Sequence, residues 1–151
     1  MRHNLFYLLI CCFYMQDACG QLRKTDLLGS WQADHAELTS MSLDTYHFYR
    51  TGRFVFNPNA YNGLNRIISI VGRYSINKDS LFLIPDSTEE LIGGYPIRSM
   101  ITTLSDTWEI TDGKIKMVVC KKKIKQAAII ERIQNEQAIS IDNQKYYKIE
   151  E

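Results

Sequence analysis

The chain has 151 residues, of which 45% are apolar, 23% charged and 11% aromatic, and its formal net charge is +1. This length fits one domain with a buried core, and the apolar fraction excludes a disordered chain. A dedicated nucleic-acid binder would be clearly basic, so the balanced charge argues against nucleic acid as a partner.

The first twenty residues have the order of regions that is typical of a secretory signal peptide. A positively charged start over 1–4 precedes an apolar run over 5–15, and a short polar and small-residue stretch follows. The apolar run is too short to span a bilayer as a helix. The sequence therefore predicts a signal peptide over 1–20 and one domain over 21–151, which is exported and then periplasmic, secreted or lipid-anchored to the outer membrane.

Two processing reactions are open at the end of this segment. Ala18 and Gly20 are small residues that suit cleavage before Gln21 by a signal peptidase. Alternatively Cys19 carries lipid, and its acyl chains then hold the domain on a membrane, which is the only membrane association that we expect. Either reaction leaves Cys120 as the one unmodified cysteine, so we predict no internal disulfide and no catalytic role for this thiol.

The remainder of the chain consists mostly of short alternating or β-branched runs separated by turn residues, which is the pattern of β-strands. The predicted strands cover residues 30–38, 46–50, 53–56, 66–76, 81–84, 98–110, 114–120, 138–141 and 145–149. A helical turn or two is predicted over 22–28. The segment 124–136 suits a helix or a strand, and we favour a strand because its isoleucines are β-branched.

Two dipeptides predict tight hairpin turns. Thr51-Gly52 separates two aromatic strands, and a two-residue turn there places Phe48 opposite Val55. Asp112-Gly113 separates two later strands and is a strong turn signal. Each hairpin places neighbouring strands antiparallel.

One connection, over 85–97, is longer than a hairpin needs. Pro85 precedes the segment, Glu89 and Glu90 lie in its first turn, and Gly93-Gly94 follows, which predicts a short helix over 86–92. Long connections in compact domains are often functional. We therefore expect this segment, with Tyr95, to act as a lid over one end of the domain.

Nine or ten strands joined by short turns form an antiparallel meander. An open sheet of that many strands leaves two bare edges, whereas closure removes them. The sequence therefore predicts an all-β, up-and-down antiparallel β-barrel of about eight to ten strands, with a short N-terminal helix. A β-sandwich is the alternative.

The start of the first strand carries a Gly-x-Trp sequence, Gly29-Ser30-Trp31, after a short helical stretch. This resembles the first motif of the lipocalin (calycin) family, and the strand layout over 22–149 is similar to lipocalin-like domains of secreted bacterial envelope proteins. The resemblance implies a lipocalin-like barrel whose lower end is closed by Trp31. It also makes Arg132 a candidate for the arginine that stacks on this tryptophan.

The aromatic side chains suggest a non-enzymatic binding protein. We expect a small apolar or amphipathic molecule inside the barrel, without a cofactor. The candidate contacts are Phe48, Phe54, Phe56, Tyr74 and Tyr95. In the alternative function, side chains fill the barrel and its outer face binds another envelope protein, as an interaction or inhibitory module.

Other chemistry has weaker support. His35, His47 and Glu37 form a metal site only in one strand register, so we interpret both histidines as rim residues and predict no metal. The lysines within 121–125 are interpreted as a solvated rim, with an acidic partner or anionic lipid as the alternative. The sequence contains no nucleophile elbow, phosphate loop or dinucleotide motif, and we expect no enzymatic activity.

Overall fold

The computed structural model describes residues 22–33, 43–60, 62–98, 108–133 and 137–149 of the chain. Within them, nine antiparallel strands form one sheet. The strands are β1 (Gly29–Ala33), β2 (Thr45–Phe48), β3 (Arg53–Asn57), β4 (Ile67–Asn77), β5 (Ser80–Arg98), β6 (Trp108–Val119), β7 (Gln126–Ile133), β8 (Ala138–Ile141) and β9 (Gln144–Ile149).

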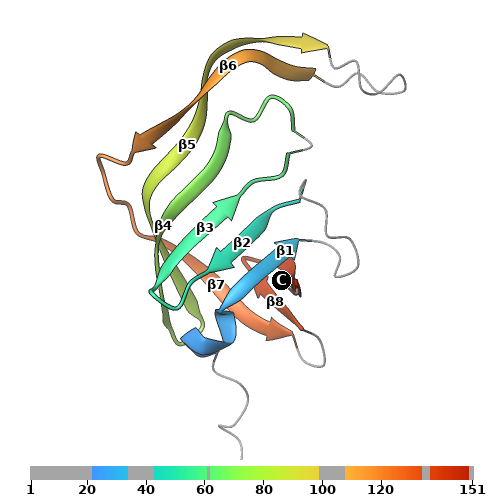
Figure 1. Cartoon of the computed structure of the whole chain (residues 1–151). Helices are drawn as coiled ribbons and strands as arrows, with labels where there is room; N and C mark the ends of the chain where they lie inside the picture. Colours follow the sequence, from blue (N-terminus) through green and yellow to red (C-terminus); the bar gives the residue numbers. More distant parts are fainter. Residues whose placement is uncertain (1–21, 34–42, 61, 99–107, 134–136, 150–151) are drawn as a thin grey trace, which may run out of the picture.

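Eight of these strands close into a barrel, because the sheet order β4-β3-β2-β1-β9-β8-β7-β5 is completed by a pairing of β4 with β5. In the described part of the chain, β6 pairs with β5 alone. Beyond Glu90, where the pairing of β5 with β4 ends, residues 91–98 of β5 and 108–115 of β6 form a two-stranded ribbon that arches beyond the barrel in Figure 1. The closed barrel confirms the predicted all-β antiparallel fold.

The hydrophobic core lies inside the barrel, on one face of its strands, because successive side chains of a strand point to opposite faces. Its buried members are Leu22, Leu27, Trp31, Ala33, Phe48, Phe54, Tyr74, Leu81, Leu83, Ala128, Ile130, Ile139, Ile141 and Tyr146. Cys120 is a free thiol. Packing of this core, rather than a covalent link, therefore holds the described strands together.

A single turn of 3₁₀ helix, η1 (Lys24–Leu27), lies where the sequence predicted a short N-terminal helix. The Arg23 backbone N–H donates to the Asp26 carboxylate at 3.0 Å and caps the turn. Leu27 is fully buried, so the turn is fixed to the lower end of the barrel. No helix in the described ranges is long and apolar enough to cross a membrane.

The aromatic hairpin of β2 and β3 has a different register from the predicted one. Phe48 lies opposite Phe54, not Val55. The turn has three residues, because the Tyr49 N–H donates to the Arg53 carbonyl at 2.9 Å and Gly52 adopts φ +82°. This positive φ suits a three-residue hairpin loop with glycine in the left-handed conformation.

The segment 86–92 is not a helix, and 85–97 is not a loop. Both belong to β5, which pairs with β4 through Glu90 and with β6 from Ser87 onward. Strand pairing on both sides of β5 outweighs the local helix signals, because those signals reflect only the intrinsic preference of the segment. Pro85 is tolerated because it lies at a register shift opposite Gly72, where a bulge relaxes the need for a backbone N–H.

The dipeptide Asp112-Gly113 is not a hairpin turn either. It lies within β6, where Gly113 is opposite Gly93 of β5. Asp112 and Gly93-Gly94 all have φ between +57° and +73°, so the two strands bend together at this point. The connection from β5 to β6 falls at 99–107, outside the described residues. The ambiguous segment 124–136 contains β7, as favoured.

Candidate functional site

The candidate aromatic residues of the interior are mostly core residues. Phe48 and Phe54 are 1% and 2% exposed, Tyr74 is also buried, and Phe56 is partly buried against them. The Phe48 and Tyr74 rings meet edge to face with centroids 4.9 Å apart. Rings that contact one another in this way fill the space between them, and each of the two large hollows described below is lined by other residues.

Tyr95 lies apart from this cluster. It is an exposed residue of the ribbon, opposite Thr111 of β6. A residue of a paired strand cannot close over the barrel as a loop would, so the lid that the sequence predicted is not formed.

Tyr46, which the sequence did not single out, lies at the centre of the aromatic cluster. Its ring stacks on Phe48 at 5.4 Å between centroids, and it meets Phe56 at 4.5 Å and Tyr146 at 5.3 Å. Burial raises the pKa of Tyr46 to about 12, and the Asp44 carboxylate contributes to the rise. The neutral phenol is therefore part of the packed interior.

Stability is expected to fall in alkaline solution between about pH 10 and about pH 12 because of Tyr46. The ordinary tyrosine pKa is 10.0, so the unfolded chain loses this proton first. The contribution, roughly 2–3 kcal/mol, is fully present below pH 10 and is lost as the pH rises through the folded-state pKa. Urea unfolding of the wild type and of Tyr46→Phe across this range measures it. Equal losses of stability in both proteins would contradict this role for Tyr46.

The lower end of the barrel is organised around Trp31. Its indole N–H donates to the Leu27 carbonyl at 2.7 Å and so ties β1 to η1. The Lys148 ammonium lies 5.6 Å from the ring centroid. Gly29, at φ +105°, leaves room for this lysine, whose Cε would be 3.4 Å from an added Cβ. The cation over the indole is therefore a lysine of β9, although Arg132 lines the same hollow of about 790 Å³.

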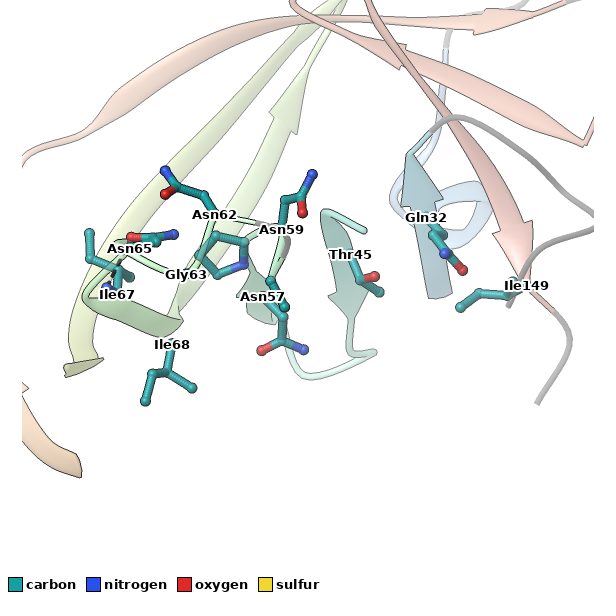
Figure 2. Close-up of a pocket in the computed structure, with 12 residues that line it drawn as sticks. Gln32, Thr45, Asn57, Asn59, Asn62, Gly63, Asn65, Ile67, Ile68 and Ile149 are labelled. Carbon is teal, nitrogen blue, oxygen red and sulfur yellow. Dashed lines mark hydrogen bonds between the residues drawn. The ribbon is translucent and has the colours of Figure 1, made fainter. Parts of the chain in front are cut away.

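A second hollow, of about 820 Å³, lies beside the connection between β3 and β4. Figure 2 shows its floor on β1, β2 and β3. Gln32 is opposite Thr45, and Thr45 is opposite Asn57, so the three side chains share one face. Their neighbours Trp31 and Tyr46 belong to the core cluster, so this is the outer face of the barrel wall. The described residues that line it are Gln32, Thr45, Asn57, Pro58, Asn59, Ala60, Asn62, Gly63, Asn65, Ile67, Ile68 and Ile149.

The connection that forms the wall of this hollow is held at several points. The Asn59 N–H donates to the Asp44 carboxylate, and the Asn65 N–H donates to the Asn62 carbonyl at 2.8 Å. The Gly63 carbonyl accepts from the Ile110 N–H of β6 at 3.1 Å. The hollow is therefore largely formed before any ligand arrives.

The described lining of this hollow is polar but uncharged. Its described residues include five primary amides and three isoleucines, and none of these described residues is ionisable. Amides can donate to and accept from hydroxyl and carbonyl groups, whereas isoleucines contact apolar carbon. Sequence reasoning missed this site, although four asparagines within 57–65 were a visible signal.

The other candidate groups have structural contacts. The Ser30 hydroxyl and the His47 Nδ1 are 2.6 Å apart. His35 and Glu37 lie outside the described residues, and the described ones contain no group of three residues that could hold a metal ion. Within the lysine cluster, the Lys123 ammonium is 3.0 Å from the Asp86 carboxylate, and Lys125 lies over the Phe82 ring at 3.7 Å. The cluster thus contributes to local packing on β5.

Comparisons with known proteins leave the fold as the firmest statement. No family model, no curated protein and no solved structure matches the chain. The eight-stranded closed barrel is compatible with a lipocalin-like fold.

Proposed function

We propose that this protein is an exported, lipocalin-like binding protein that holds a small neutral amphipathic molecule without catalysis and without a cofactor. The observation that carries the proposal is that the described residues lining the hollow beside the β3–β4 connection are uncharged. A charged ligand would lose its hydration there without gaining an ion partner from these residues. A neutral molecule with hydroxyl or carbonyl groups has a smaller desolvation cost, and it gains hydrogen bonds to the amides.

The size of the hollow supports a ligand of small-molecule dimensions. Its volume of about 820 Å³ falls within the range of roughly 300–1,000 Å³ that is usual for such sites. Ile67, Ile68 and Ile149 offer apolar contact, which contributes about 25 cal/mol for each Å² removed from water. The polar amides then set the orientation of the ligand.

Export and family membership are parts of the same proposal. The region order of residues 1–20 supports a signal peptide. The calycin assignment draws on Gly29 and Trp31 of the Gly-x-Trp sequence and on the eight-stranded closed barrel. Mass spectrometry of the natively processed protein distinguishes cleavage before Gln21 from lipidation of Cys19, and under native conditions it also detects a retained small molecule.

Binding of a neutral alkyl glycoside tests the proposed ligand class. We expect octyl glucoside, below its micelle concentration, to bind with a Kd at least about tenfold lower than that of octyl sulfate, which has the same chain and a negative charge. Isothermal titration calorimetry of the natively processed protein measures both. Equal affinities, or no saturable binding of the glycoside, would contradict the proposal.

A matched pair of variants locates the site. Ile68→Asp introduces a charge into the lining and is expected to weaken glycoside binding at least about tenfold. Ile129→Asp places the same change on the exposed outer wall of β7 and should leave the Kd unchanged. If both variants bind like the wild type, the glycoside occupies another part of the protein.

The packed interior favours a second candidate function, in which the barrel is an interaction module for another envelope protein. Phe48, Phe54 and Tyr74 are buried against one another and against the rest of the core. A filled barrel presents only its outer surface to partners. Crosslinking in the intact envelope would then recover a stable neighbouring protein.

A further inference from the structure

The strand β6 has a long edge without a strand partner in the described part of the chain. On one side it pairs with β5 from Trp108 to Val119. Near its start, the Ile110 N–H reaches the Gly63 carbonyl on the other side. From Gly113 to Val119 the order of the described strands gives this other side no neighbour, and Figure 1 shows β6 at the outer margin of the ribbon.

A row of apolar side chains accompanies this edge. Ile115, Met117 and Val119 are 63%, 72% and 69% exposed. Because side chains alternate along a strand, the three share one face, which Leu91 of β5 continues opposite Ile115. A long edge strand with an exposed apolar row can pair with another chain. Proteins usually avoid such a strand unless it serves as an interface.

The backbone groups of the same residues point outward. The Leu91 N–H donates to the Arg66 carbonyl, which is on the side away from β6. Its partner Ile115 therefore directs its own N–H and C=O away from β5, and alternation extends this to Met117 and Val119. The Cys120 N–H donates to the Asp86 carbonyl of β5, as the same alternation requires. Hydrogen-bonding groups and apolar side chains are thus presented together.

We propose that two copies of this chain associate by antiparallel pairing of their β6 edges, with the two-fold axis at Met117. This register places Met117 opposite Met117 of the second copy and Ile115 opposite Val119 of the second copy. The exposed row then packs alongside the same row of the other copy, on one face of the joined sheet. A continuous sheet forms across the two ribbons, in the way that closed two-fold dimers bury self-complementary surfaces.

The distribution of charged residues favours this register. It also favours a second copy of the chain as the partner of the β6 edge. A two-fold axis at Lys116 would place that lysine opposite itself, and an axis at Ile115 would place Lys114 opposite Lys116 of the other copy; both are unfavourable. With the axis at Met117, Lys116 faces Val118 of the second copy instead. Asp112, in the first half of β6, then approaches the basic residues at 121–122 that follow the strand in the second copy.

The mass of the natively processed protein in solution tests the association. Light scattering coupled to gel filtration, at tens of micromolar protein, is expected to give a dimer. Met117→Lys should raise the dimer Kd by about 100-fold or more, because it places two charges on the axis. The control Ile129→Lys changes another exposed apolar residue, on β7, which is 62% exposed against 72% for Met117, and this variant should remain dimeric. A monomeric wild type, or a dimer that survives Met117→Lys, would overturn the proposal.

Crosslinking tests the register and does not depend on how the lysine variant folds. In a Cys120→Ser background, Met117→Cys should oxidise to a disulfide-linked dimer. The reason is that Cα atoms of a hydrogen-bonded antiparallel pair are about 5.5 Å apart, within disulfide reach. Ile129→Cys in the same background should stay monomeric on a non-reducing gel. Equal crosslinking of both variants, or none at Met117→Cys, would rule out this pairing.

Discussion

Replacing Trp31 by alanine is expected to lower the free energy of unfolding by about 3–5 kcal/mol, as is usual for a large buried aromatic residue. Trp31 is a core residue at the lower end of the barrel, and its indole is also the hydrogen-bond donor to η1. Alanine leaves a cavity, removes that hydrogen bond and uncovers Leu27. Urea denaturation monitored by circular dichroism measures the loss.

A second variant separates the two contributions of this indole. Trp31→Phe keeps an aromatic ring for the core and for Lys148 but cannot donate to the Leu27 carbonyl, so a loss of only about 1–2 kcal/mol is expected. A loss below about 1 kcal/mol in the alanine variant would mean that Trp31 does not close the barrel.

Gly72→Ala is expected to cost about 3 kcal/mol or more, although it adds a single methyl group. A Cβ at Gly72 would lie 2.3 Å from the Ile84 carbonyl oxygen, 2.7 Å from the Phe54 ring and 2.9 Å from the Pro85 Cα. Two of these three contacts are backbone atoms of β5, which cannot rotate away. The pairing of β4 with β5, which closes the barrel, would therefore have to shift.

A glycine of the ribbon provides the control for this substitution. Gly93 has no atom within 4 Å of an added Cβ, but its φ is +73°. Gly93→Ala should therefore cost only the backbone strain, about 1–2 kcal/mol. Comparable losses from both variants in urea denaturation would show that β4 and β5 can separate at Gly72 without penalty.

The barrel could be predicted from the sequence because its evidence is local and repeated. Alternating runs such as 66–76 predict strands, and short turns between strands predict antiparallel neighbours. The edge argument then favours closure. The burial of Tyr74 in the interior agrees with its position on the predicted strand 66–76, whereas the predicted hairpin register placed Phe48 and Phe54 on opposite faces.

The ribbon could not be predicted because its cause is not local. Residues 86–92 carry helix signals, and only pairing with β4 and β6, which are distant in sequence, makes them a strand. The hairpin register was missed by one residue because Gly52 allows a three-residue loop. Such a slip exchanges the faces of a whole strand.

The outer hollow was missed for a related reason. Gln32, Thr45 and Asn57 come from three strands, and only the observed register places their side chains together. Two of the three lie at the end of a strand, where the sequence pattern is least informative. The asparagine-rich connection was visible, but its position over these strands depends on anchors such as Asp44 and Ile110.

The 19-residue strand β5 has two parts: its first half belongs to the barrel wall, and its second half belongs to the ribbon. The Arg66 guanidinium, next to the asparagine-rich connection, donates to the carbonyls of Leu91 at 3.0 Å and Gly93 at 2.6 Å, where the ribbon leaves the barrel. These hydrogen bonds link the ribbon to the segment that encloses the outer hollow. We therefore expect ligand binding in that hollow and bending of the ribbon to be thermodynamically coupled, with each shifting the other by the same free energy.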